Sequence, residues 1–365
     1  MKTLTHSCLA CVLFSLTLAA VMWPEELPAS KVLRLKEAEF RQSLGQVLFS
    51  QDGSLYVAYR LRERNQRSAI LRVMKFDPVT GETKATADFP LPQVRLPRAS
   101  TNFILSSDSS LLAYAELHSP QVLLTIDAAT LKPISSSRAA LFSKYDLAVQ
   151  IKDFSSQALV LSAERPTRRR PITIESVHEV ALNPQNLSQV ISEKKMSVAD
   201  SPSELQTWMK MSREDLSLVV PLEDGALGFT DLKTRGGITL FDSAGKGLAS
   251  LPLRDCGVTK AAVTPDREFA LAVCERPVRN EQHHQTGCLR KAILFAVNTL
   301  RVLRNLPMSG LTLKEQGSDA EDPWSESPSP AIWRGKDEIL VAIPDSSSTI
   351  KLYTFSLTTD KTSGE

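Results

Sequence analysis

Short apolar runs separated by polar turns recur along most of the chain. Residues 47–55 contain an apolar run, a Gln-Asp-Gly-Ser turn and a second apolar run, and residues 103–111 repeat this order. Gly, Asp and Ser favour the tight turns that connect antiparallel strands. Each segment therefore predicts a β-hairpin. Looser copies of the same pattern occupy residues 151–161, 211–216, 262–269 and 332–339.

A second pattern follows most of these hairpins. It is an apolar strand that ends in Asp or Asn before another polar turn, as at residues 76–81. Related segments occupy residues 126–130, 241–245 and 297–299. Together the two patterns predict repeating units of four antiparallel strands.

These units resemble the WD40-like and YVTN-type β-propeller repeats of bacteria, whose blades have a similar Asp-Gly first turn and a similar Asp-x-x-Thr-Gly third turn. The resemblance covers about residues 45–360 and is strongest in the first, second and fifth units, although the Gly-His and Trp-Asp dipeptides of true WD40 repeats are missing. It implies an all-β fold, a single β-propeller of four-stranded antiparallel blades. Six units are visible and we expect six blades, while seven would bring the unit length closer to the roughly 40–45 residues usual for such repeats.

The ring of such a fold needs closure where the first and last blades meet. The alternating segment Val32-Leu33-Arg34-Leu35 precedes the first complete unit and fits a strand that pairs with the last strand, at residues 350–355. A linker without a partner is the alternative for this segment. The expected organisation is a signal peptide at residues 1–20, a linker with the ring-closing strand at 21–43, the propeller at 44–360 and a tail at 361–365.

The N-terminus carries the features of a secretory signal. Lys2 precedes an uncharged apolar run at residues 8–23, which Pro24 ends abruptly. The run is shorter than the roughly 20 residues that cross a bilayer comfortably. We therefore expect an exported protein, periplasmic or extracellular, with cleavage after Ala19 or Ala20 and no further membrane span. An uncleaved N-terminal membrane anchor is the alternative.

Export changes the interpretation of the cysteines. Cys256, Cys274 and Cys288 remain after removal of the signal, and an oxidising compartment favours a disulfide. We predict that Cys274 and Cys288 clamp the neck of a long hairpin. The alternatives are free thiols, or a zinc site that Cys274 and Cys288 share with His283 and His284.

Composition and motifs narrow the chemistry. The 365 residues are 42% hydrophobic and 23% charged, with 43 basic and 41 acidic residues, which describes a globular chain and excludes disorder, collagen and a multispanning membrane protein. A net charge of +2 gives no argument for nucleic acid, and no sequence-specific nucleic-acid binding is expected. The chain has no nucleophile elbow, P-loop, His-Glu-x-x-His or dinucleotide motif, so we predict no cofactor and assign no catalytic residue.

Arginines gather in the segments that would join the second and third strands of several blades. All such segments emerge on one face of a propeller, so they predict an Arg-rich face suited to carboxylate, sulfate or phosphate groups. The opposite face would carry the turn aspartates. Ordinary solvated loops are the alternative explanation. The candidate ligand-binding residues are Arg60, Arg62, Arg64, Arg67, Arg165, Arg168, Arg169, Arg170, Arg276 and Arg279.

The function that these patterns favour is binding. We expect an exported, non-catalytic β-propeller that holds a protein or an anionic polymer on its Arg-rich face. A metal-dependent propeller hydrolase or lactonase is the alternative, with a carboxylate-lined site in the central channel that would need Ca²⁺ or Zn²⁺.

Overall fold

The computed structural model describes residues 28–35, 40–63, 69–91, 101–116, 121–142, 147–166, 174–197, 216–230, 236–253, 256–279, 281, 285–309, 311–312, 329–346 and 348–357. The predicted signal peptide and C-terminal tail lie outside these ranges. Within them, no helix is long and apolar enough to cross a membrane.

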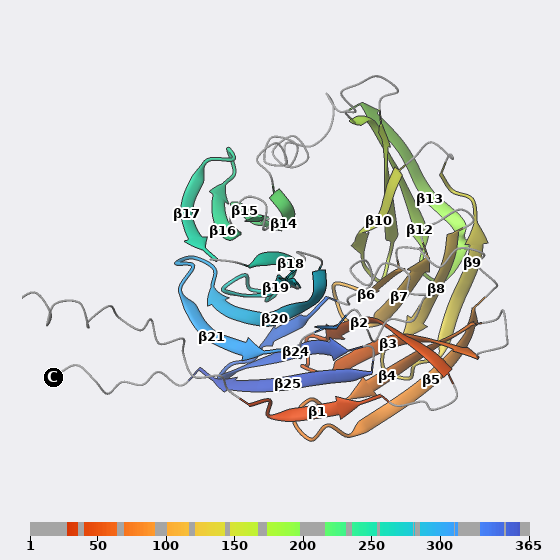
Figure 1. Cartoon of the computed structure of the whole chain (residues 1–365). Coiled ribbons are helices and arrows are strands. Elements are labelled where there is room, and N and C mark those ends of the chain that lie inside the picture. Colours follow the sequence, from red (N-terminus) through yellow and green to blue (C-terminus); the bar gives the residue numbers. More distant parts are fainter. Residues whose placement is uncertain are drawn as a thin grey trace, which may run out of the picture.

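The described strands form six antiparallel sheets of the same plan, arranged as the blades of a propeller ring (Figure 1). The expected all-β propeller and its six blades are thus confirmed. Blade 1 holds β2 (Phe40–Phe49), β3 (Leu55–Glu63), β4 (Ala69–Phe76) and β5 (Thr83–Leu91); blade 2 holds β6 (Thr101–Leu105), β7 (Leu111–Glu116), β8 (Gln121–Asp127) and β9 (Pro133–Ala139); blade 3 holds β10 (Leu147–Phe154), β11 (Leu159–Pro166), β12 (Ile174–Asn183) and β13 (Asn186–Ser197).

The second half of the ring follows the same order along the chain. Blade 4 holds β14 (Leu216–Leu222), β15 (Gly225–Thr230), β16 (Gly237–Asp242) and β17 (Gly247–Pro252); blade 5 holds β18 (Gly257–Val263), β19 (Phe269–Arg279), β20 (Gln285–Ala296) and β21 (Val302–Pro307), with the short β22 (Leu311–Thr312) beside β20; blade 6 holds β23 (Ala331–Arg334), β24 (Glu338–Ser346), β25 (Thr349–Ser356) and β1 (Lys31–Arg34).

The N-terminal strand closes the ring. β1 pairs antiparallel with β25, with Val32 opposite Lys351 and Leu33 opposite Ile350, so blade 6 takes its outer strand from the other end of the chain. This is the pairing that the alternation of Val32–Leu35 predicts. Leu33 is buried in a hydrophobic cluster that contains residues of both blade 6 and blade 1, while Val32 points outward.

Apolar side chains fill the spaces between neighbouring blades. Separate clusters join blades 6 and 1, 1 and 2, 2 and 3, 4 and 5, and 5 and 6. Every residue of the second strand of blade 2, β7, is buried, because alternate residues face the two neighbouring blades. This explains why the second strands are continuous apolar runs rather than alternating ones.

The space between blades 3 and 4 differs in the described residues. No hydrophobic cluster there includes side chains from both blades. Alternation along β10, β11 and β12 turns Lys152, Glu164 and Glu179 toward blade 4, and Lys152 pairs with Glu179. On blade 4, a small cluster around Phe241 faces this side.

Contacts between turns link several blades on one edge of the ring. Gln51 Nε2 donates to Ser107 O over 2.7 Å, and Trp333 Nε1 donates to Gln51 O over 3.1 Å. Gly53, in the same turn as Gln51, has a φ of 79°, and a Cβ there would lie 3.2 Å from the Trp333 ring. The position therefore requires glycine both for its backbone conformation and for the space that the tryptophan occupies.

Ring closure predicts unequal effects of two neighbouring substitutions in β1. Leu33→Ala removes a side chain that is 6% exposed and should lower the free energy of unfolding by about 2–4 kcal/mol. Val32→Ala is the matched control, because Val32 is 43% exposed, and should change it by less than about 0.5 kcal/mol. Urea titration of both variants measures the difference. Equal losses, or no loss for either, would contradict the closure role of β1.

Candidate functional site at the b–c edge of the ring

The connections between the second and third strands of the blades define one edge of the ring, which we call the b–c edge. The opposite edge, which we call the a–b edge, carries the turns between the first and second strands. The letters a, b, c and d denote the first to fourth strands of a blade in chain order. Of the ten predicted arginines, the structure describes the side chains of four: Arg60, Arg165, Arg276 and Arg279. Arg62 lies in β3, whereas Arg64, Arg67, Arg168, Arg169 and Arg170 lie outside the described residues.

Arg60 is engaged within the protein. Its Nη2 lies 3.2 Å from Oε1 of Glu116, a carboxylate of blade 2 that is almost completely buried. Tyr114 Oη donates to the same oxygen over 2.8 Å, and burial raises the pKa of Tyr114 well above its ordinary value. A buried carboxylate without a cation is costly. Arg60 therefore serves the joint between blades 1 and 2 rather than a ligand.

The other three candidate arginines with described side chains lie near the ends of second strands. Arg165 is exposed near the end of β11, and Arg276 and Arg279 are exposed at the end of β19. The last two belong to the hairpin of β19 and β20. We call residues 276–279 and 285–289 of this hairpin the arm.

The arm extends beyond the inner strand of its own blade. β18 begins at Gly257, opposite Glu275, so the register of β18 against β19 ends one residue before Arg276. From there, Arg276 pairs with Leu289 of β20, and β22 pairs with the other side of β20 at Cys288. The side chains of Val278 and Leu289 are 37% and 49% exposed. The arm therefore presents apolar and guanidinium groups together at the surface.

A disulfide lies at the base of the arm, and it corrects our predicted pairing. Cys274 is bonded to Cys256, with the two Cα atoms 5.5 Å apart, and Cys288 is a buried free cysteine. Cys274 lies opposite Lys291 and Cys288 lies opposite Pro277, so the predicted partners differ by three positions in register and face opposite sides of the sheet. Burial raises the pKa of the Cys288 thiol to about 11.

The zinc alternative involved His283 and His284, which lie outside the described residues. Among the residues that the structure describes, no group of three or more His, Cys, Asp or Glu side chains is placed to hold a metal ion.

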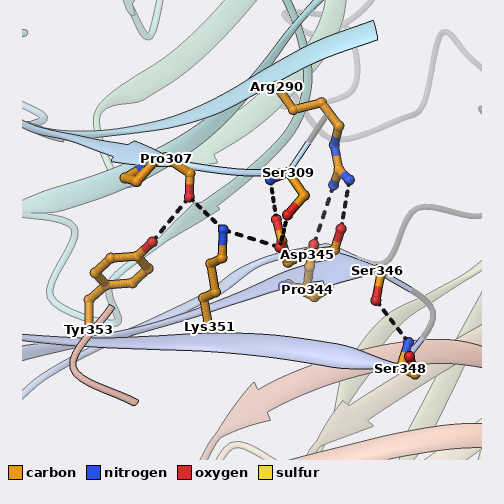
Figure 2. A network of polar contacts seen from close by, with 9 residues as sticks. All are labelled: Arg290, Pro307, Ser309, Pro344, Asp345, Ser346, Ser348, Lys351 and Tyr353. Carbon is orange, nitrogen blue, oxygen red and sulfur yellow. Dashed lines mark hydrogen bonds and ion pairs between the residues drawn. The ribbon is translucent and has the colours of Figure 1, made fainter. Parts of the chain in front are cut away.

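A polar network holds the base of the arm against blade 6 (Figure 2). Arg290 Nη1 donates to Asp345 O over 3.0 Å and Nη2 donates to Pro344 O over 3.3 Å, both at the end of β24. On its own blade, Arg290 Nε lies 3.5 Å from Glu275 Oε1. Burial raises the pKa of Glu275, and the positive charge of Arg290 opposes that shift.

The Asp345 carboxylate continues this network (Figure 2). It accepts hydrogen bonds from Ser309 N and Ser309 Oγ, each over 2.6 Å, and lies 3.1 Å from Lys351 Nζ. Lys351 Nζ and Tyr353 Oη both donate to Pro307 O over 3.2 Å. The end of blade 5, at Pro307 and Ser309, is thereby attached to blade 6 by charged groups that are themselves paired. The network is a joint, and its members are not available to a ligand.

The turn aspartates of the opposite edge are also used locally. Asp108 accepts from Ser106 Oγ over 2.6 Å and from Ser110 N over 3.1 Å, and the hydrogen bond from Ser106 lowers the pKa of Asp108 far below its usual range. Asp77 accepts from Val79 N and Thr80 N in the same manner. These carboxylates shape their own turns. Their recurrence in the sequence therefore reflects turn geometry.

Comparisons with known proteins do not assign the chain to a family. No protein-family model and no curated protein matches the chain. Among solved structures, the chain is similar to a protein of unknown function from Dyadobacter fermentans (11% identity, TM-score 0.43, 90% of this chain and 98% of that one) and to U3-55K (11% identity, TM-score 0.40, 89% and 99%). It is also similar to Raptor from Chaetomium thermophilum (9% identity, TM-score 0.37, 90% of this chain and 29% of that one).

The polar network between blades 5 and 6 predicts that replacing the buried Arg290 strongly lowers stability. Arg290→Ala leaves Glu275 buried without its cation and should lower the free energy of unfolding by about 3–5 kcal/mol in urea titration. Arg304→Ala, at an exposed position of β21, is the control and should cost less than about 0.5 kcal/mol. Similar small costs for both variants would show that the network does not hold the blades together.

The lowered pKa of Asp108 predicts a pH-dependent contribution to stability. The folded-state pKa lies below the unfolded value, so the contribution is present above the unfolded pKa, about 4, and is lost as the pH falls toward the folded value. The stability difference between wild type and Asp108→Asn should therefore be larger at pH 7 than at pH 3. Urea titration at the two pH values measures it, and a difference that grows at pH 3 would contradict the assignment.

Proposed function

We propose that the protein is an exported, non-catalytic scaffold whose b–c edge binds the acidic surface of a partner protein, with the arm as the main contact. The observation that carries this proposal is the joint exposure of Arg276, Arg279, Val278 and Leu289 on one hairpin. Arginine beside apolar groups is typical of protein interfaces, where the guanidinium pairs with carboxylates and the apolar groups lose their contact with water.

The arrangement of charge on the arm supports an acidic partner. Lys291 lies next to the arm on the same sheet face as Arg276, and its pKa is lowered by burial and by the positive charge of Arg276. Like charges repel one another, and an approaching carboxylate relieves that repulsion. An anionic partner therefore gains from this face more than a neutral one.

The proposed location rests on two features. The N-terminal sequence has the pattern of a secretory signal, and Cys256 and Cys274 are within disulfide distance of one another. Disulfides persist mainly in oxidising compartments. Both features support export to the periplasm or the exterior.

Retention on immobilised polyglutamate in a salt gradient tests the binding proposal. The double variant Arg276→Ala/Arg279→Ala should bind about tenfold more weakly than wild type at low salt, since each exposed charge pair contributes up to about 1 kcal/mol. It should also elute at lower salt, because salt screens exposed charges.

Two comparisons make the result specific. Arg301→Ala/Arg304→Ala removes the same charge from exposed positions of blade 5 outside the arm and should elute like wild type. Equal elution of all three proteins would overturn the proposal. Retention on immobilised heparin but not on polyglutamate would replace the protein partner by a sulfated polymer. Metal content after dialysis separately tests the hydrolase alternative.

A further inference from the structure

The arm loses the support of its inner neighbour at a definite point. β18 contacts β19 through the pairs from Gly257–Glu275 to Val263–Ala270. Among the residues that the structure describes, the pairing of β18 with β19 does not continue past Glu275 toward the tip. We call the point after Glu275, where β18 and β19 separate, the fork. Beyond the fork, the order of the arm depends on its pairing with β20 and β22 and on the contacts that hold its base. A two-stranded hairpin is only marginally stable by itself in water.

The disulfide lies at this fork. Cys256 immediately precedes β18, and Cys274 immediately precedes Glu275 in β19. Both sulfur-bearing side chains are buried in the hydrophobic cluster that includes Leu253 and Val258. The covalent bond thus joins the residue before β18 to Cys274, which is one residue before the last β18–β19 pair and two residues before Arg276.

The two faces of the base are held by different means. Cys274 faces blade 4 and is held covalently, whereas Glu275 faces blade 6 and is held by Arg290. The network of Arg290 does not involve sulfur and is unaffected by oxidation state (Figure 2). Loss of the disulfide therefore releases one side of the base and leaves blades 5 and 6 joined.

We propose that oxidation of Cys256 and Cys274 switches on the arm: the disulfide orders the base of the β19–β20 hairpin so that it binds its acidic partner, and the dithiol form leaves the arm frayed while the ring stays closed. The binding consequence rests on the function proposed above, and the ordering of the arm does not. Ordering a binding element in advance raises affinity because less conformational entropy is lost on association.

The chemistry of the switch is thiol–disulfide exchange. Two protein thiols give up two protons and two electrons to a disulfide carrier, whose S–S bond breaks to give two thiols as the Cys256–Cys274 bond forms. Cys288 does not compete, because its buried thiol has a pKa raised to about 11 and stays protonated at neutral pH.

Hydrogen exchange of the full chain tests the ordering directly. In Cys256→Ser/Cys274→Ser, and in wild type purified under a dithiol reductant, the amides of residues 276, 278, 279 and 285–290 should exchange about tenfold faster than in oxidised wild type, as expected for local opening. Amides of blades 1 and 2 should be unchanged. The double variant measured with and without the reductant is the control and should exchange equally in both, because it has no Cys256–Cys274 disulfide to break. The reduced wild type serves as a second measurement if the double variant fails to fold.

Two results would overturn the inference. One is unchanged protection of the arm in the reduced protein, and the other is an equal loss of protection in every blade, which would make the disulfide a general stabiliser of the ring.

The binding assay separates the two proposals. Reduced wild type should elute from polyglutamate at the same salt concentration as the oxidised Arg276→Ala/Arg279→Ala variant. If oxidised wild type already elutes with that arginine variant, the proposed function fails, while faster exchange of the arm on reduction still supports the ordering by the disulfide. If oxidised and reduced wild type are retained equally and both exceed the arginine variant, the switch fails and the proposed function stands.

Discussion

The pairing of β1 with β25 is the contact on which the ring depends. In the described residues, hydrophobic clusters join five of the six pairs of neighbouring blades. A blade at an open seam would therefore expose one apolar face and one unpaired strand edge. The seam is closed by main-chain pairing between the two ends of the chain, and Thr354 N also donates to Ser30 Oγ over 3.1 Å. The cluster around Leu33 and Leu352 then joins blade 6 to blade 1. A pairing of only four residue pairs thus allows blades 6 and 1 to pack together.

Polar contacts complete the joints at the two edges, where hydrophobic packing ends. At the b–c edge, Arg60 pairs with Glu116 of the next blade. Arg290 pairs with Glu275 of its own blade and donates to Pro344 O and Asp345 O of blade 6. At the a–b edge they are turn contacts, such as those of Gln51 with Trp333 and Ser107. Polar groups at the rim of a packed interface need partners once water is displaced. The basic residues of the b–c edge therefore fall into two groups. Some hold neighbouring blades together through paired polar contacts, and the others are exposed to solvent.

Sequence reasoning succeeded where the signal is local. The alternation of Val32–Leu35 predicts a strand, and the Asp-containing turns predict hairpins, because both depend on neighbouring residues. It failed for Cys274, because the prediction placed this residue at the neck of the β19–β20 hairpin with Cys288. Its partner Cys256 lies at the neck of the preceding hairpin, immediately before β18. The role of Arg60 could not be predicted from the sequence either, because its partner Glu116 belongs to another blade.

The contrast between Arg60 and Arg276 shows what makes the arm a candidate site. Both residues end the second strand of a blade, but Arg60 faces a neighbouring blade that supplies a buried carboxylate, whereas Arg276 stands beyond the last residue that β18 supports. The guanidinium of Arg276 is exposed and is therefore accessible to a partner outside the chain. Exposed apolar groups such as Leu289 add a gain on association that charge alone lacks. Elsewhere in the ring, Arg60 joins two neighbouring blades. Because the β19–β20 hairpin extends past its blade, Arg276 and Arg279 are exposed and available for binding.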